Sequence, residues 1–138
     1  SPEEGSRTVE ISKSEMKFST INEDLEKLTK NENCEKTVFL FHAPPHDTKL
    51  DRAALDNKVI DHVQVDVNVG SIAIRKFIEV KQPMLTLHGH IHESTELTGE
   101  WRDKIGKTIC FNASSRKSKL SIIKFQLDNI NNAERILI

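Results

Sequence analysis

The sequence predicts an α/β fold with a mixed sheet flanked by helices, and the order of three segments carries this prediction. An apolar run at residues 37–41, a segment with helical periodicity at 71–80 and a second apolar run at 84–87 follow one another. This is the order of a β-α-β unit, in which two parallel strands lie in one sheet. After Gly99, apolar and polar residues alternate in the manner of further strands.

Length and composition indicate a single water-soluble unit over residues 1–138. A chain of this length buries roughly two-thirds of its unfolded surface, so it needs neither a metal nor a disulfide in order to fold. The formal net charge is -1, which argues against general binding to nucleic-acid backbones, because such binding requires a basic excess. The longest apolar run, at 38–41, is far shorter than the roughly 20 residues of a membrane helix. The first residues are acidic and polar, unlike a secretion signal, and the only two cysteines are far apart in the sequence. We therefore expect a cytoplasmic protein without a membrane contact.

The amino-terminal part predicts one short strand and one helix. Residues 8–11 alternate apolar and polar side chains like a strand. Thr20 is followed three residues later by Glu23, which is the pattern of a capping box at the start of a helix. We expect an amphipathic helix over 20–30, and its apolar face would consist of Ile21, Leu25 and Leu28.

The first strand of the β-α-β unit is expected at 37–41. Its β-branched and aromatic residues do not alternate with polar ones, which predicts a strand covered on both faces. Pro44 and Pro45 end this strand, because proline cannot donate to a ladder. In the polar stretch that follows, residues 63–67 predict a short alternating strand.

The helix at 71–80 and the strands after it complete the expected architecture. Ser71 is expected to cap the helix, and phosphate binding by the amide groups at the helix start is the alternative. Pro83 separates this helix from the strand at 84–87. Two further strands are expected, at 108–111 and 120–127.

Histidines follow both strands of the β-α-β unit. His42 comes after the first strand, and His88, His90 and His92 come after the second. Because the carboxyl ends of parallel strands meet at one edge of a sheet, we expect His42, His90 and His92 to converge, with Gly89 permitting a sharp turn. Neutral imidazole is a good ligand for zinc, iron, nickel and copper. The pattern predicts a metal site, and the alternative is three histidines on surface loops.

These motifs resemble the last two motifs of the calcineurin-like metallophosphoesterases. The similarity is closest to small predicted phosphoesterases akin to bacterial cyclic-nucleotide phosphodiesterases, and it covers the chain from about residue 8 to the end. Four segments carry it: His42-Ala43-Pro44-Pro45, the Gly-Ser-Ile-Ala-Ile-Arg-Lys-Phe-Ile-Glu run at 70–79, Gly89-His90-Ile91-His92, and the strand and Asn turn at 106–115.

The resemblance implies a fold, a reaction and a set of site residues. The chain would be the carboxyl-terminal half of a β-sandwich flanked by helices. His42 and His90 would ligate one divalent ion and His92 a second, the ions being manganese, iron, zinc or nickel. A hydroxide held by the ions would attack the phosphorus of a phosphomonoester or phosphodiester, cyclic nucleotides included. Apart from the resemblance, the position of His88 at the end of the second strand predicts a catalytic residue that contacts the substrate or supports a metal ligand, and the alternative is a histidine packed at the strand end.

The chain lacks the motifs that the family carries in the first half of its domain. The family motifs D-x-H, G-D-x-x-D and G-N-H-[DE] are absent, and with them the carboxylate that bridges the two ions. Three histidines alone are expected to bind at most one ion weakly. Two hypotheses follow: half of an enzyme, or a non-catalytic interaction module of the same fold. Because half a sheet exposes an edge and an apolar face, we expect a homodimer or a complex with the missing half.

Overall fold

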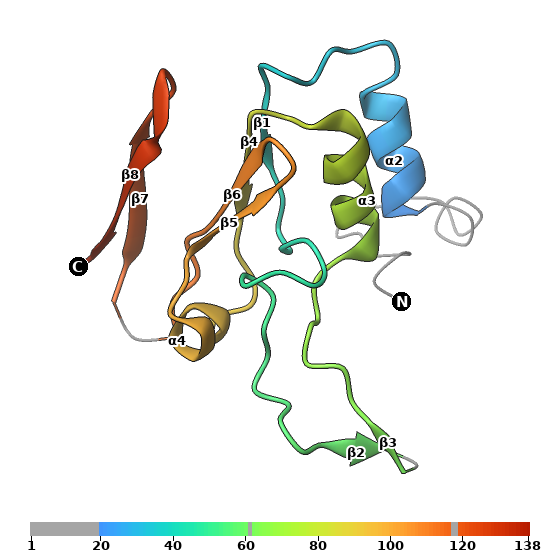
Figure 1. Cartoon of the computed structure of the whole chain (residues 1–138), viewed down its shortest axis with the longest axis vertical. Helices are drawn as coiled ribbons and strands as arrows, with labels where there is room; N and C mark the ends of the chain where they lie inside the picture. Colours follow the sequence, from blue (N-terminus) through green and yellow to red (C-terminus); the bar gives the residue numbers. More distant parts are fainter. Residues whose placement is uncertain (1–19, 61, 117–118) are drawn as a thin grey trace, which may run out of the picture.

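The computed structural model describes residues 20–60, 62–116 and 119–138. The strand expected at 8–11 lies outside these residues. In chain order the elements are α2 (Ile21–Leu28), β1 (Val38–Leu40), β2 (Val59–Ile60), β3 (Val63–Gln64), α3 (Ile72–Lys81), β4 (Leu85–His88), α4 (Ser94–Thr98), β5 (Arg102–Ile105), β6 (Thr108–Asn112), β7 (Ser121–Gln126) and β8 (Asn129–Leu137) (Figure 1).

A mixed four-stranded sheet forms the centre of the fold, with the strand order β1-β4-β6-β5. β1 and β6 both pair with β4 in parallel, and β5 pairs with β6 in antiparallel. β1 and β4 are joined through α3, so the predicted β-α-β unit is confirmed. The predicted α/β class, with a mixed sheet flanked by helices, is confirmed as well.

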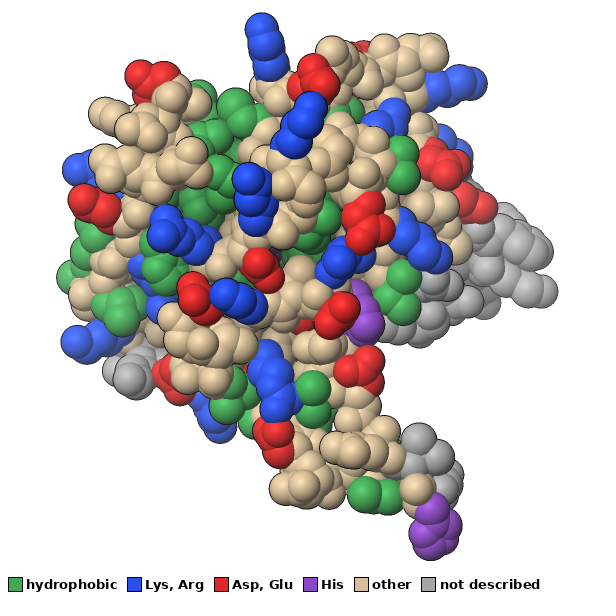
Figure 2. Space-filling view, in the orientation of Figure 1, with side chains coloured by type: hydrophobic (Ala, Val, Ile, Leu, Met, Phe, Trp, Pro, Cys, Tyr) green, Lys and Arg blue, Asp and Glu red, His purple; other side chains and the backbone are tan. Residues whose placement is uncertain are grey.

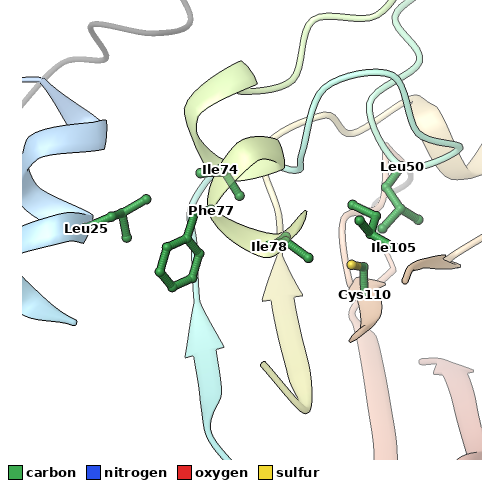
Figure 3. Packing of buried hydrophobic residues seen from close by; sticks show 7 residues of the cluster. All are labelled: Leu25, Leu50, Ile74, Phe77, Ile78, Ile105 and Cys110. Atoms are coloured by element: carbon green, nitrogen blue, oxygen red, sulfur yellow. The ribbon is translucent and has the colours of Figure 1, made fainter. Parts of the chain in front are cut away.

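The sheet is covered by helices on one face and by a β-hairpin on the other. Figure 1 places α2 and α3 on one side of the sheet and the hairpin of β7 and β8 on the other. The core on the helical side combines residues of α2, α3, β5 and β6 with Leu50 of the loop after β1 (Figure 3). On the hairpin side, Leu85, Phe111 and Ile130 are buried together. Adjacent residues Cys110 and Phe111 belong to different clusters, because side chains alternate along a strand.

The predicted burial of residues 37–41 on both faces is wrong. Leu40 is 79% exposed, although Val38, on the same side of β1, packs against the hairpin cluster. β1 is the outermost strand of the sheet, so the cover on its hairpin side is incomplete. The two expected helix caps are confirmed: Thr20 and Glu23 form a capping box, and the Ser71 hydroxyl accepts a hydrogen bond from the Ile74 N–H.

Residues 53–60 and 62–68 form an arm that stands away from the sheet, with β2 and β3 at its far end (Figure 1). Among the helices of the described residues, none has the length and apolar character required to cross a membrane.

Candidate functional site

The predicted metal ligands lie at the carboxyl ends of β1 and β4. The ladder between these strands continues past their ends, since the Phe41 N–H donates to the Leu87 carbonyl (2.9 Å) and the Gly89 N–H to that of His42 (3.1 Å). The rings of His42 and His90 are consequently close, with centroids 4.5 Å apart and planes inclined by 49°. Both residues are exposed. The structure therefore brings these two imidazoles together, as the parallel order of the strands predicts.

The turn that presents His90 is strained. The Ile91 N–H donates to the Gly89 carbonyl (2.9 Å), and this closes a γ-turn with His90 at its centre. The φ angle of His90 is 72°, in the left-handed region that glycine favours. The expectation that Gly89 permits the sharp turn is wrong, because Gly89 does not have a positive φ. Strain of this kind is found at functional sites, where the position of a side chain matters more than stability.

We expect His90→Gly to stabilise the fold by about 1 kcal/mol relative to His90→Ala, because glycine adopts a positive φ without a Cβ penalty. Both variants remove the imidazole, so the comparison isolates the effect of the backbone conformation at this position. Urea denaturation of the two variants measures the difference. Equal stability would show that the His90 backbone is not strained.

His92 lies close to the loop that follows β6. Its Nδ1 is 3.2 Å from the Ser115 carbonyl oxygen, and because a carbonyl only accepts, Nδ1 carries the proton in this contact. Nε2 then keeps its lone pair, which is the arrangement of many metal-bound histidines. Across the described residues, however, no three His, Cys, Asp or Glu side chains form a group that could hold a metal ion. The pair of His42 and His90 fits half a ligand set, and further donors would have to complete it.

His88, the last residue of β4, is buried and only 5% exposed. Its Nδ1 donates to the Ala43 carbonyl (2.9 Å), and its Nε2 accepts from the Thr86 hydroxyl (2.8 Å). Burial lowers the pKa of His88 to about 4, partly opposed by the hydrogen bond to Ala43. Its ring also stacks on Phe41, with centroids 5.7 Å apart. A direct catalytic role stays a prediction, and the geometry fits the alternative of a histidine packed at the strand end.

The start of α3 fixes the loop that carries His42. The Ser71 N–H donates to the Pro44 carbonyl (2.9 Å), and the Ser71 carbonyl accepts from the His46 N–H (3.1 Å). Gly70 lies so close to this loop that a Cβ would be 2.7 Å from the carbonyl oxygens of Pro44 and Pro45. Only glycine allows this approach. The predicted role of Ser71 as a helix cap is confirmed.

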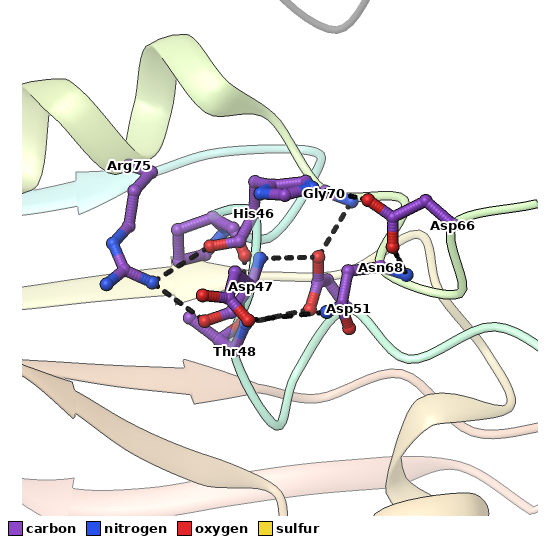
Figure 4. A network of polar contacts seen from close by, with 9 residues as sticks. His46, Asp47, Thr48, Asp51, Asp66, Asn68, Gly70 and Arg75 are labelled. Carbon is purple, nitrogen blue, oxygen red and sulfur yellow. Dashed lines mark hydrogen bonds and ion pairs between the residues drawn. The ribbon is translucent and has the colours of Figure 1, made fainter.

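A buried carboxylate joins the two ends of the arm. Asp51 is fully buried and accepts hydrogen bonds from the N–H groups of Asp47 (3.0 Å), Thr48 (2.9 Å) and Gly70 (3.0 Å) (Figure 4). Burial raises the pKa of Asp51 above its ordinary 3.8, and the three N–H groups oppose this shift. The sequence carries no signal for this role, because Gly70 lies 19 residues away from Asp51 and only the fold brings them together.

The other polar groups of this region also hold the loop. Arg75 of α3 donates to the carbonyls of His46 (3.0 Å) and Asp47 (2.7 Å). His46 Nε2 lies 3.2 Å from an Asp66 carboxylate oxygen. The pKa of Asp66 is lowered, first by the Asn68 N–H and further by His46. Asp66 thus pairs with His46, whereas no bond joins it to His42, His90 or His92 among the described contacts.

No known family profile matches the chain. An uncharacterized protein of Methanocaldococcus jannaschii is 40% identical over 84 residues, which are 59% of this chain and 33% of that protein. The chain therefore spans about a third of the curated relative it matches.

Two solved structures are also similar in fold. One covers 83% of this chain and 36% of its own, with a TM-score of 0.49 and 18% identity. A crystal structure of a Thermus thermophilus protein covers 83% and 38%, with a TM-score of 0.45 and 16% identity.

Proposed function

We propose that the chain provides part of the metal centre of a metal-dependent phosphoesterase of the calcineurin-like kind. The observation that carries the proposal is the close approach of the His42 and His90 rings at the carboxyl ends of two parallel strands. His42 and His90 would share one divalent ion (manganese, iron, zinc or nickel), and His92 would hold a second. The substrate would be a phosphomonoester or a phosphodiester.

Divalent ions, when bound, polarise phosphoryl oxygens and lower the pKa of a coordinated water. The chain's own residues position the ligands. The γ-turn fixes the ring of His90, and the hydrogen bond from Nδ1 to Ser115 leaves the Nε2 of His92 available. His88 supports the loop of His42 through the Ala43 carbonyl. The remaining metal donors, in particular a bridging carboxylate, would come from residues other than these three histidines.

Metal binding tests the proposal directly. We expect manganese or zinc titrated into chelator-free protein to bind at about one ion per chain, because two or three imidazoles form only a partial set. His42→Ala and His90→Ala are each expected to weaken binding about tenfold or more. His62→Ala is the matched control, since His62 is an exposed histidine outside the pair and its removal should leave binding unchanged.

The outcome separates the proposal from its alternatives. Absence of binding to the wild-type chain, or equal loss in His62→Ala, would contradict the metal site. Binding without hydrolysis of a chromogenic phosphodiester in added manganese would support a half-site that needs its other half.

A non-catalytic interaction module of the same fold is the second candidate function. It is favoured by the absence, within the described residues, of any three-donor group. Binding of a partner protein that survives the triple change His42→Ala/His90→Ala/His92→Ala would support this module. We place either function in the reducing cytoplasm, which agrees with the two buried free thiols, Cys34 and Cys110.

A further inference from the structure

The outer face of the β7–β8 hairpin carries four exposed aliphatic side chains. Ile122 and Ile136 lie opposite each other on the two strands and are 38% and 40% exposed. Just beyond them, Leu120 and Ile138 exchange two backbone hydrogen bonds of 2.9 Å and are 63% and 70% exposed. Hydrophobic side chains are visible at the left edge of the space-filling view, where Figure 1 places β8 and the carboxyl terminus (Figure 2). We call Leu120, Ile122, Ile136 and Ile138 the apolar quartet.

A charged pair adjoins the quartet on the same face. Lys124 of β7 lies opposite Glu134 of β8, and both side chains are exposed. Side chains alternate along β7, so Lys124 shares the outer face with Ile122, while Ile123 and Phe125 pack inward on the sheet. The outer face thus has an apolar end and a charged end, with the positive charge on β7 and the negative charge on β8.

We propose that two copies of the chain dimerise by packing these outer faces together. A two-fold axis parallel to the strands places β7 of one copy over β8 of the other. Each apolar quartet then covers the second quartet, and each Lys124 faces Glu134 of the second copy. Such an interface is isologous, as in most homodimers. It buries the apolar side chains and pairs the opposite charges in the same arrangement. This inference does not depend on the proposed metal site.

The hairpin consists of only two strands, and this also favours the dimer. Two strands form a sheet of marginal stability, and here only the inner face is packed. Stacking a second hairpin on the outer face, at the usual spacing of about 10 Å, buries the exposed quartet and gives β7 and β8 a packed layer on both sides. Dimerisation would therefore stabilise the part of the fold that is least covered.

Sedimentation equilibrium of the full chain tests the dimer. The monomer mass is 15.7 kDa, and we expect the wild-type chain to associate to twice that value at high concentration. Ile136→Lys is expected to weaken the dimer by about 100-fold, since it places a charge in the apolar contact. Val80→Lys is the control, because Val80 is a 78% exposed aliphatic residue of α3. A monomeric wild type at every concentration would overturn the proposal, as would equal loss in both variants.

A charge exchange tests the two-fold arrangement itself. Lys124→Glu and Glu134→Lys each place like charges across the interface, and each alone is expected to weaken the dimer about tenfold. When the two variants are mixed, every interchain pair again has opposite signs, while the like-charge pairs inside each hairpin persist. Recovery of the dimer on mixing therefore reports the interchain contact. A mixture of the two folded variants that stays monomeric would overturn this geometry.

Discussion

Asp51→Ala is expected to destabilise the fold by roughly 3–5 kcal/mol, although Asp51 is neither a metal ligand nor part of the hydrophobic core. The change leaves the buried N–H groups of Asp47, Thr48 and Gly70 without their acceptor. Each such loss costs about 1–3 kcal/mol. Asp51→Asn is expected to cost less, because one amide oxygen still accepts. Urea denaturation at neutral pH measures both effects.

The control for this prediction is Asp66→Ala. Asp66 also accepts a backbone hydrogen bond, from Asn68, but its side chain is 63% exposed, so we expect a change within about 1 kcal/mol. Equal losses at Asp51 and Asp66 would mean that burial does not decide the cost.

The pH dependence gives a second check of Asp51. A pKa raised above 3.8 in the folded state means that this group's contribution to stability decreases as the pH rises through the interval above 3.8. Asp51→Asn should abolish that decrease.

The sequence predicts the parts of the fold that depend on local pattern. The apolar runs on either side of α3 define β1 and β4, and Thr20 and Ser71 mark the starts of α2 and α3. The meeting of His42 and His90 also follows from local pattern, because parallel strands end on the same side of a sheet.

What the sequence does not predict depends on distant contacts or on backbone geometry. The exposure of Leu40 depends on β1 being the outermost strand, which only the complete strand order decides. The sequence does not predict β8, because the polar residues 131 and 132 interrupt the alternation of apolar and polar side chains. The left-handed turn falls on His90 and not on the adjacent glycine, against conformational preference. The proximity of the His42 and His90 rings is thus predictable, whereas the positive φ angle of His90 is not.

Acidification from pH 7 to pH 4 is expected to cost the fold about 3 kcal/mol through His88 alone. In the unfolded chain this imidazole takes up a proton near its ordinary pKa of 6.5, whereas burial lowers its pKa to about 4 in the fold. The unfolded state therefore binds more protons as the pH falls through this window, and stability is lost between 6.5 and about 4. Asp51 acts in the opposite direction above 3.8, so the net loss measured in the wild type will be smaller.

Urea denaturation of His88→Gln at several pH values separates the His88 contribution. Glutamine offers a donor and an acceptor but no titrating group, so the variant should be less stable at pH 7 and lose less stability on acidification. His62→Gln, at an exposed position on the arm, should keep the wild-type slope. An unchanged slope in His88→Gln would mean that His88 remains neutral to the same pH in both states. Protonation of His88 would break its acceptance from the Thr86 hydroxyl, and Nδ1 of the same ring donates to the Ala43 carbonyl in the loop that carries His42.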